Sequence, residues 1–544
     1  MKRSTTGTHT EKGKIYPSVQ QKHIIEKLYS DCCSAYNCVV AVVKKQLEGL
    51  ESCNEYVVAK EVNGSLGKEI SVLEAKAEKA SGTEKTQLEN EIKTKKALKK
   101  SALDAMKTLI KVYGLTEYSL EPLIRDIRDK YSIPKDLFGG SILIRVIAAV
   151  DDYLWRNGED IAFKRKKDFL SLQNKTNASA LRFLSGKLCF FKNYKTAFEI
   201  PVKFAGDEYS EEALNGRVKY PSLVRYMKKG EWCYEVQLAI EGPAPQKRNK
   251  QGGIRHPIKS GRAGLDVGTK VIAFVTEDMV LLQELCSDFD YIEDEKRQAA
   301  LKQKIDVCRR ANNPHKYNED GTCKKDDKTP WVVSKRQAKL EAECREISRK
   351  QAAKREFSHK TLVNKLVGFA DTIITEDNDV KGWQKKKGRE QDANGKEKSR
   401  KNHGFSIGHC APAMFVMLLD RNLKNNKHPG VIKVNTDKLR ATDYNHVTQT
   451  YEEHKLSERV VYVNGRPYQR DLYAAYKLLY TNASGTGYDQ KALEDNFARF
   501  TELHDAEILR HKGMKNPGSM GIDKLLKYLE SVQAAEYNRR VLWN

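Results

Sequence analysis

The chain has 544 residues, and its 97 Lys and Arg outnumber its 73 Asp and Glu, which gives a formal net charge of +24 at pH 7. Hydrophobic residues make up 39% and aromatic residues 8% of the chain. This is enough for several buried cores, and it excludes a disulfide-rich miniprotein, a membrane-spanning protein and a low-complexity fibre. The charge surplus favours a polyanionic partner, nucleic acid first, over an ordinary basic enzyme.

The compartment is indicated by the first residues, the most apolar stretch and the cysteines. Residues 1–14 are polar and basic and lack the apolar segment of a secretory signal. The most apolar stretch, 142–150, is too short to cross a bilayer and contains Arg145. The 11 cysteines are odd in number and scattered, which is typical of reduced thiols. We therefore expect a cytoplasmic protein that makes no membrane contact.

The first 157 residues favour helices after one short strand. Ser81-Gly82-Thr83-Glu84 has the form of a capping box, in which Ser81 and Glu84 satisfy free amide donors at a helix start. The predicted elements are a strand over 14–20 that ends at Pro17, a helix over 20–43, a helical hairpin within 65–111 and a helix over 141–155.

From residue 159 the apolar period changes to the alternation of strands, and an α/β pattern follows a Pro- and Gly-rich linker at 242–262. Strands of a small sheet or barrel are predicted over 187–191, 196–202 and 232–240. Beyond the linker we expect a β-meander over 263–285, helices over 290–310, 334–370 and 411–423, and strands over 371–376 and 430–434.

Two partial motifs fail in their context, and a third familiar motif is absent. Gly404–Gly408 matches G-x-S-x-G, but the polar text at 395–402 cannot form the buried strand that a hydrolase elbow needs. Cys308, His315 and Cys323 lack the further ligands of a metal site, so chance is favoured. No Walker A sequence is present, which removes the case for an NTPase.

Three acids remain in particular settings. Asp266 lies in a predicted strand between Gly264 and Gly268, on the face opposite its apolar neighbours, and these glycines would let a phosphate backbone approach. Glu376 ends the apolar strand 372–376. Asp471 begins an amphipathic helix, where an acid is also simply a good partner for the helix dipole.

Together the acids follow the order of an RNase H-like nuclease: a strand acid, an acid at a strand end and an acid at a helix start. That chemistry needs hard oxygen ligands that hold two Mg²⁺ or Mn²⁺ ions about 3.5–4 Å apart. A DDE-type transposase shares this core, but the Asp–Glu–Asp order argues against it.

On these residues the chain resembles TnpB, the transposon-encoded RNA-guided nuclease, and the related type V CRISPR effectors. Segments similar to the three RuvC motifs are Gly264-Leu265-Asp266-Val267-Gly268, then Ile373-Ile374-Thr375-Glu376-Asp377-Asn378 with Val380-Lys381-Gly382, then Arg470-Asp471-Leu472-Tyr473-Ala474-Ala475. Further similar segments are Tyr16-Pro17, Cys33-Ser34-Ala35-Tyr36-Asn37, Phe163-Lys164-Arg165-Lys166-Lys167, and Arg309-Arg310-Ala311-Asn312-Asn313-Pro314 followed by Tyr317-Asn318-Glu319-Asp320-Gly321.

The resemblance implies a multidomain α+β protein with an amino-terminal wedge β-barrel, interrupted by a helical recognition lobe, and a carboxy-terminal RNase H-like (RuvC) nuclease domain. The implied layout is wedge barrel 1–22 and 158–255, recognition lobe 23–157, RuvC motifs I and II within 260–436, a target-nucleic-acid-binding insert over 437–468, and motif III with the last helices over 469–544.

The resemblance also implies an RNA-guided DNA endonuclease, monomer favoured, that binds a guide RNA of the omega or CRISPR type and target double-stranded DNA. Asp266, Glu376 and Asp471 would be catalytic and would bind two Mg²⁺ (or Mn²⁺) ions. The alternative is a nuclease-inactive RNA-guided DNA-binding repressor. Relatives of that kind usually lose one or more of the acids.

Two departures and two basic segments complete the expectations. Residues 436–470 contain no cysteine, so no structural zinc is expected, and 443–448 should fold without metal. The third motif has Gln469 and Tyr473 where relatives often have Asp and Asn. Lys164, Arg165, Lys166 and Lys167 are expected to contact guide RNA. Residues 381–401, with nine Lys and Arg against three Asp and Glu, are expected to form a basic loop that binds single-stranded DNA through Lys385, Lys386, Lys387 and Arg389.

Overall fold

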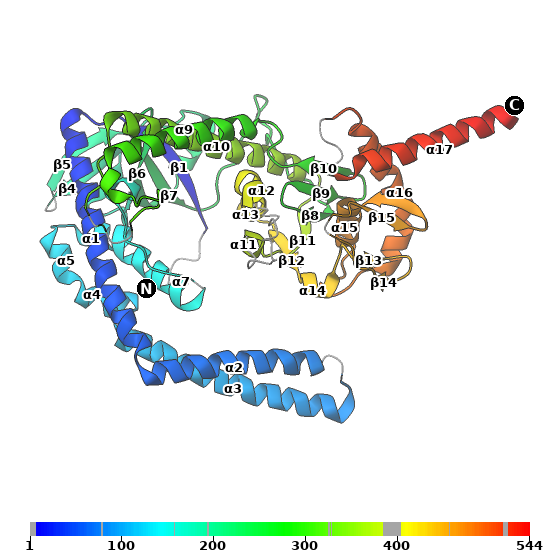
Figure 1. The fold of residues 1–544 in the computed structure, drawn as a ribbon, viewed down its shortest axis with the longest axis horizontal. Coiled ribbons are helices and arrows are strands. Elements are labelled where there is room, and N and C mark those ends of the chain that lie inside the picture. The colour runs from blue at the N-terminus through cyan, green and yellow to red at the C-terminus, as the bar shows by residue number, and fades with distance from the viewer. Residues whose placement is uncertain are drawn as a thin grey trace. The chain divides into compact units, whose positions relative to one another are not determined.

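The fold is mixed α/β. The computed structural model describes residues 7–77, 80–156, 158–192, 195–324, 327, 329–384, 404–455, 457–514 and 520–543. The chain divides into two compact units, Met1–Pro245 and Gln246–Asn544, each with sheets and helices of its own (Figure 1).

The first unit begins with a strand at Thr8–Ile15, further toward the amino terminus than the predicted strand over 14–20. The helices of this unit, apart from the last, come between that strand and the next one. They are α1 (Val19–Glu51), α2 (Asn54–Ala77), α3 (Gly82–Val112), α4 (Glu117–Leu123), α5 (Arg125–Lys130), α6 (Lys135–Phe138), the π-helix η1 (Gly139–Leu143), α7 (Ile144–Trp155), the 3₁₀ helix η2 (Lys166–Asp168) and α8 (Glu208–Leu214). The predicted hairpin is confirmed, because α2 and α3 lie side by side (Figure 1).

The predicted capping box at Ser81 is wrong. Ser81 does precede α3, but its side chain makes no capping hydrogen bond. A capping box forms instead at Ser18, whose Oγ accepts from Gln21 N at 3.3 Å while Gln21 Oε1 accepts from Ser18 N at 2.8 Å. The box at the start of α1 fixes where the buried face of this helix begins. That face reaches the sheet through Tyr29, whose hydroxyl donates to Leu223 O at 2.7 Å.

The strands of the first unit form two open antiparallel sheets. One has the order β1-β7-β6-β2 and the other β3-β4-β5. Their bounds are β1 (Thr8–Ile15), β2 (Ser171–Gln173), β3 (Leu181–Leu184), β4 (Lys187–Lys192), β5 (Lys195–Pro201), β6 (Val218–Lys228) and β7 (Glu231–Glu241), which confirms the three strands predicted after residue 159. The part of this unit that the structure describes contains no closed barrel, contrary to the expectation, because β1 and β2 are edge strands that do not pair with each other.

The second unit is built around a five-stranded sheet with the order β10-β9-β8-β11-β12. The strands are β8 (Arg262–Val267), β9 (Val271–Val275), β10 (Val280–Glu284), β11 (Thr372–Glu376) and β12 (Val431–Val434). The first three form the predicted antiparallel meander, and β11 runs parallel to both β8 and β12. The expected α/β pattern of the carboxy-terminal half is therefore confirmed.

Helices cover both faces of this sheet. On one face, α10 (Lys335–Val367) and α13 (Pro412–Asn425) pack against Ala263, Leu265 and Ile373. On the other face, α15 (Arg470–Leu479) crosses β8, β9 and β11.

The other elements of this unit are α9 (Tyr291–Asn312), η3 (Pro314–Lys316), α11 (Val380–Gln384), α12 (Gly404–Cys410), α14 (Thr436–Leu439), β13 (Tyr444–Asn445), β14 (Thr450–Tyr451), β15 (Val460–Val463), β16 (Arg466–Gln469), α16 (Gln490–Arg510) and α17 (Ile522–Trp543).

Candidate active site

The pairing of β8 with β11 brings Asp266 and Glu376 together. The two strands are parallel, and their register pairs Ile374 with Gly264 and Thr375 with Leu265. The next residue on each strand is Glu376 and Asp266. Neighbouring strands lie about 4.8 Å apart and paired residues point to the same face, so the two carboxyl groups leave one edge of the sheet side by side.

Asp471 reaches the same place from α15. Arg262, at the start of β8, donates from Nε to Leu479 O at 2.7 Å, at the carboxyl end of α15. Two residues along the strand, a Cβ on Gly264 would overlap the carbonyl oxygen of Ala475. The helix and the strand therefore run in opposite directions. Asp266, two residues beyond Gly264 on β8, lies level with Asp471, which is one helical turn before Ala475 on α15.

This contact corrects the expected role of Gly264. The space beside it is filled by the backbone of α15, because a Cβ would also meet Leu479 N at 2.5 Å, so no phosphate backbone can approach there. The glycine is needed for close packing of helix on strand. At Gly268 the nearest atom to a Cβ would be Val271 O, at 3.0 Å.

The acids influence one another electrostatically. Burial is the main cause that raises the pKa of Asp266 well above its ordinary value, and the charges of Asp471 and Glu376 raise it further. Burial also raises the pKa of Glu376, against the hydrogen bond that its Oε1 accepts from Ala441 N at 3.0 Å. Acids whose charges raise the pKa of Asp266 lie close to it, and such a cluster favours a cation among its members.

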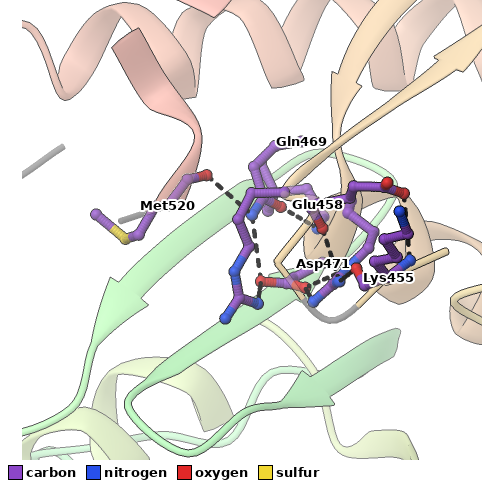
Figure 2. Close-up of polar contacts among 8 residues, drawn as sticks. Lys455, Glu458, Gln469, Asp471 and Met520 are labelled. Atoms are coloured by element: carbon purple, nitrogen blue, oxygen red, sulfur yellow. Dashed lines mark hydrogen bonds and ion pairs between the residues drawn. The ribbon is translucent and has the colours of Figure 1, made fainter. Parts of the chain in front are cut away.

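Positive and polar groups surround the carboxylate of Asp471 (Figure 2). Its Oδ1 accepts from Arg470 Nε at 3.1 Å and Nη2 at 3.0 Å. Its Oδ2 accepts from Gln469 Nε2 at 3.2 Å and lies 3.5 Å from Arg459 Nη1. Both oxygens of this acid are therefore engaged within the protein.

The three carboxylates fit a magnesium site by their chemistry, because they are hard oxygen donors that project to one edge of one sheet. Nevertheless, among the residues that the structure describes, no group of three or more His, Cys, Asp or Glu side chains is arranged so that it could hold a metal ion. Asp266, Glu376 and Asp471 would be the ligands of a magnesium ion bound at this edge of the sheet.

Gln469, one of the two unusual residues of the third motif, has a structural role. Gln469 is the N-cap of α15, and its Oε1 accepts from Leu472 N at 2.7 Å. The backbone N of Gln469 donates to Nε2 of the buried His504 at 3.0 Å, and His504 Nδ1 lies 3.1 Å from Asp505 Oδ1. The start of the helix that carries Asp471 is thus held from both sides. The sequence offered no signal for His504, which lies 35 residues further along the chain.

The segment between the second and third motifs is anchored to α15 and its surroundings by hydrogen bonds to main-chain oxygens. Lys477 Nζ donates to Tyr444 O and Gln490 Nε2 to His446 O, while Tyr488 Oη donates to Leu439 O at 2.9 Å. These contacts hold the main chain at 439–446 beside α15 and the start of α16.

Lys477 is a site residue that sequence reasoning missed. Its side chain is fully buried, its Nζ lies 3.9 Å from the Tyr473 ring centroid, and its charge lowers the pKa of Glu376. Burial in turn lowers the pKa of Lys477 to about 7. A lysine on the apolar face of a helix that begins with an acid was the available signal.

The basic segment at 164–167 lies in the first unit and is held by the half-buried side chain of Asn37. Lys164 N donates to Asn37 Oδ1, and Asn37 Nδ2 donates to Lys164 O, both at 2.8 Å. Lys164 Nζ lies 4.9 Å from the centroid of the Tyr36 ring. Arg165, Lys166 and Lys167 are exposed, and Arg165 pairs with Asp168 at 2.6 Å. Two segments that are 127 residues apart in the sequence are thus held together.

The remaining predictions have mixed outcomes. Lys385, Lys386, Lys387 and Arg389 lie outside the described residues, as does most of 381–401. Gly404–Gly408 lies within the helix α12, which agrees with the exclusion of a hydrolase elbow. None of the helices that the structure describes combines the length and apolar composition needed to span a bilayer.

Comparison with known proteins gives structural neighbours only. No protein-family model matches the chain, and no curated protein matches it. The solved Cas12f1–sgRNA–target DNA complex is similar with a TM-score of 0.39 and 12% identity, over 88% of this chain and 99% of that one. The neighbours are type V CRISPR effectors. A CRISPR–Cas12f ternary complex is similar with a TM-score of 0.25 and 12% identity, over 87% of this chain and 98% of that one. A Cas12i1 R-loop complex after target DNA cleavage is similar with a TM-score of 0.24 and 10% identity, over 90% of this chain and 65% of that one.

Proposed function

We propose that the protein is an RNA-guided DNA endonuclease whose chemistry takes place at Asp266, Glu376 and Asp471. The observation that carries the proposal is the register of β8 and β11, which sets two acids side by side, together with the packing of α15 on Gly264, which brings the third level with them. Bound there, two Mg²⁺ ions would supply activation of the attacking water and stabilisation of the leaving oxygen.

The protein's own residues set the conditions for this chemistry. Asp266 and Glu376 project from rigid strand ends, where their positions do not depend on a loop. Lys477 supplies a buried positive charge that offsets part of the acid cluster. Gln469 and His504 fix the turn from which Asp471 projects.

Guide RNA and target DNA are the partners that the motif resemblance and the charge support. The surplus of 24 positive charges suits many phosphate contacts. The held segment at 164–167 presents three exposed basic side chains that match a phosphate backbone. Pairing between guide and target would supply sequence specificity, while the protein reads a short flanking duplex.

The test begins with the RNA that copurifies with the protein. Sequencing this RNA should reveal one dominant non-coding species with a variable end. The complex, given Mg²⁺ and a DNA library that carries the matching target, should cut only molecules with the match and a common flanking motif. Copurification of random RNA and the absence of matched cutting would reject the proposal. Guided binding without any cutting would establish the repressor instead.

A further inference from the structure

The carboxylate of Asp471 is already engaged within the protein. Arg470 and Gln469 donate hydrogen bonds to it, and Arg459 pairs with its Oδ2. In the described part of the chain the three acids do not form a group that could hold a metal ion. Two of the groups that engage Asp471, Arg470 and Arg459, carry a positive charge that a metal ion would have to displace or tolerate.

Arg470 is the stronger of the two partners. Its side chain is 8% exposed and donates twice to Asp471 Oδ1, at 3.1 and 3.0 Å. The same guanidinium donates from Nη1 to Glu458 O at 2.7 Å and to Lys455 O at 3.3 Å. Charge-assisted pairs of this kind, shielded from water, are much stronger than surface ion pairs.

Arg459 is the more accessible partner. Its Nη1 lies 3.5 Å from Asp471 Oδ2, and its side chain is 39% exposed. It makes one long contact with the acid where Arg470 makes two short ones, so it can leave at a lower cost. Its charge also lowers the pKa of Asp266, which places its positive charge within reach of the strand acids.

We propose that Arg470 and Arg459 are positioning residues that act as internal counter-ions of Asp471, so that metal loading requires their release. This inference rests on the proposed function, because it concerns the same three carboxylates. A guanidinium and a divalent cation cannot share one carboxylate cheaply, because two like charges would then stand a few ångströms apart. The folded protein without nucleic acid is therefore a resting state with weak affinity for divalent ions.

The test measures metal binding and does not depend on cleavage. Mn²⁺ binding to the full-length protein, free of nucleic acid, is followed by electron paramagnetic resonance for wild type, Arg459→Gln and Arg470→Gln. We expect Mn²⁺ to bind about tenfold more tightly to each variant, because one repelling charge is gone. Arg499→Gln is the matched control, since Arg499 pairs with Glu502 at 3.0 Å within α16 of the same unit, away from the three acids, and the Mn²⁺ affinity of this variant should equal that of wild type.

A second set of variants separates this inference from the function on which it rests. Adding Asp471→Asn to Arg459→Gln should abolish the gain in Mn²⁺ affinity. Unchanged or weaker Mn²⁺ binding in Arg459→Gln would overturn the inference. In that case, loss of binding in Asp266→Asn and Asp471→Asn would leave the proposed nuclease site intact, and no loss would reject that site as well. Arg459→Gln keeps the test decisive even if Arg470→Gln fails to fold, because Arg459 is partly exposed.

Discussion

Gly264 and Ala475 are in direct backbone contact, where β8 passes beneath α15, and no side chain fits between them. We expect Gly264→Ala to destabilise the second unit by about 1–3 kcal/mol or more, because the added methyl overlaps backbone that cannot move aside. It should also move Asp471 out of line with Asp266 and abolish cleavage. Denaturant unfolding and cleavage assays would measure both effects.

The control for this prediction is Gly408→Ala, in α12 of the same unit. A Cβ at this position meets nothing within 4 Å, and alanine favours a helix over glycine. This variant should therefore be at least as stable as wild type. Equal stability of Gly264→Ala and wild type would show that the helix is not seated as described.

The three acids should be needed for cutting and not for binding. Asp266→Ala, Glu376→Ala and Asp471→Ala should each reduce cleavage below detection, because each removes a hard oxygen ligand. Guided DNA binding should remain within about twofold of wild type, because base pairing and phosphate contacts carry the affinity.

Gel-shift and cleavage assays side by side would check this prediction. Asp278→Asn serves as the matched control, since Asp278 is an exposed acid in the turn between β9 and β10. Any of the three variants that cut at the wild-type rate would lose its assigned role.

The basic segment at 164–167 should contribute charge to guide-RNA binding. Replacing Arg165, Lys166 and Lys167 with Gln should weaken RNA binding and reduce the dependence of log Kd on log salt by about 2, because each lost single-strand phosphate contact removes about 0.7 from the slope. Filter binding over a salt series would measure this.

Asn37→Ala provides a comparison that changes no charge. It removes the two 2.8 Å bonds that hold Lys164, so RNA affinity should fall while the salt slope stays the same. Wild-type RNA affinity in the triple Gln variant would show that these side chains do not contribute to RNA binding.

A second basic segment gives a prediction for DNA. Replacing Lys385, Lys386, Lys387 and Arg389 with Gln should slow cleavage and flatten its salt dependence, because fewer counter-ions are released. Guide-RNA binding should barely change. Cleavage rates that match wild type across a salt series would contradict a role for these residues.

Acid should destabilise the second unit through His446. Burial, and after it the positive charge of Lys477, lowers the pKa of His446 from its ordinary 6.5 to about 4. As the pH falls from about 6.5 to 4, the unfolded chain takes up a proton that the folded chain does not. The stability therefore declines over this window, by an amount on the order of 3 kcal/mol.

Denaturant unfolding at pH 7, 5.5 and 4.5 would test the effect of His446. His446→Gln should be less stable than wild type at pH 7, because its ring packs among buried aromatics and its Nδ1 lies 2.6 Å from the Tyr473 hydroxyl. The variant should then lose less stability on acidification. Parallel stability curves for the two proteins would show that His446 does not titrate as described.

Local patterns in the sequence predicted the elements well, and contacts between distant residues explain what they missed. The meander and β11 were readable because their apolar residues repeat with the period of a strand. The role of Gly264 could not be predicted, because a small residue near an acid is compatible both with a ligand that approaches the backbone and with a helix packed against it. Ser81 shows the limit of a local motif, since a capping box in the sequence does not guarantee the hydrogen bond.

For the site, the three acids could be selected from the sequence around them, but the residues that surround them in the fold could not be predicted. Lys477, His504 and Arg470 act through contacts with groups that lie 12 to 35 residues away, and no local period encodes such partners. The pairing of Asp471 with Arg459, 12 residues earlier in the chain, likewise depends on the fold and not on a local pattern.

The anchoring of the segment between the second and third motifs has a consequence for how this region can change. Its hydrogen bonds run from side chains of Lys477, Tyr488 and Gln490 to main-chain oxygens at 439, 444 and 446. Every amino acid offers a carbonyl oxygen, so substitutions at the accepting positions keep these hydrogen bonds, whereas substitutions of the three donors break them. Its exposed tip at 447–450 is therefore a place where new sequence can be introduced without rebuilding the core of the second unit.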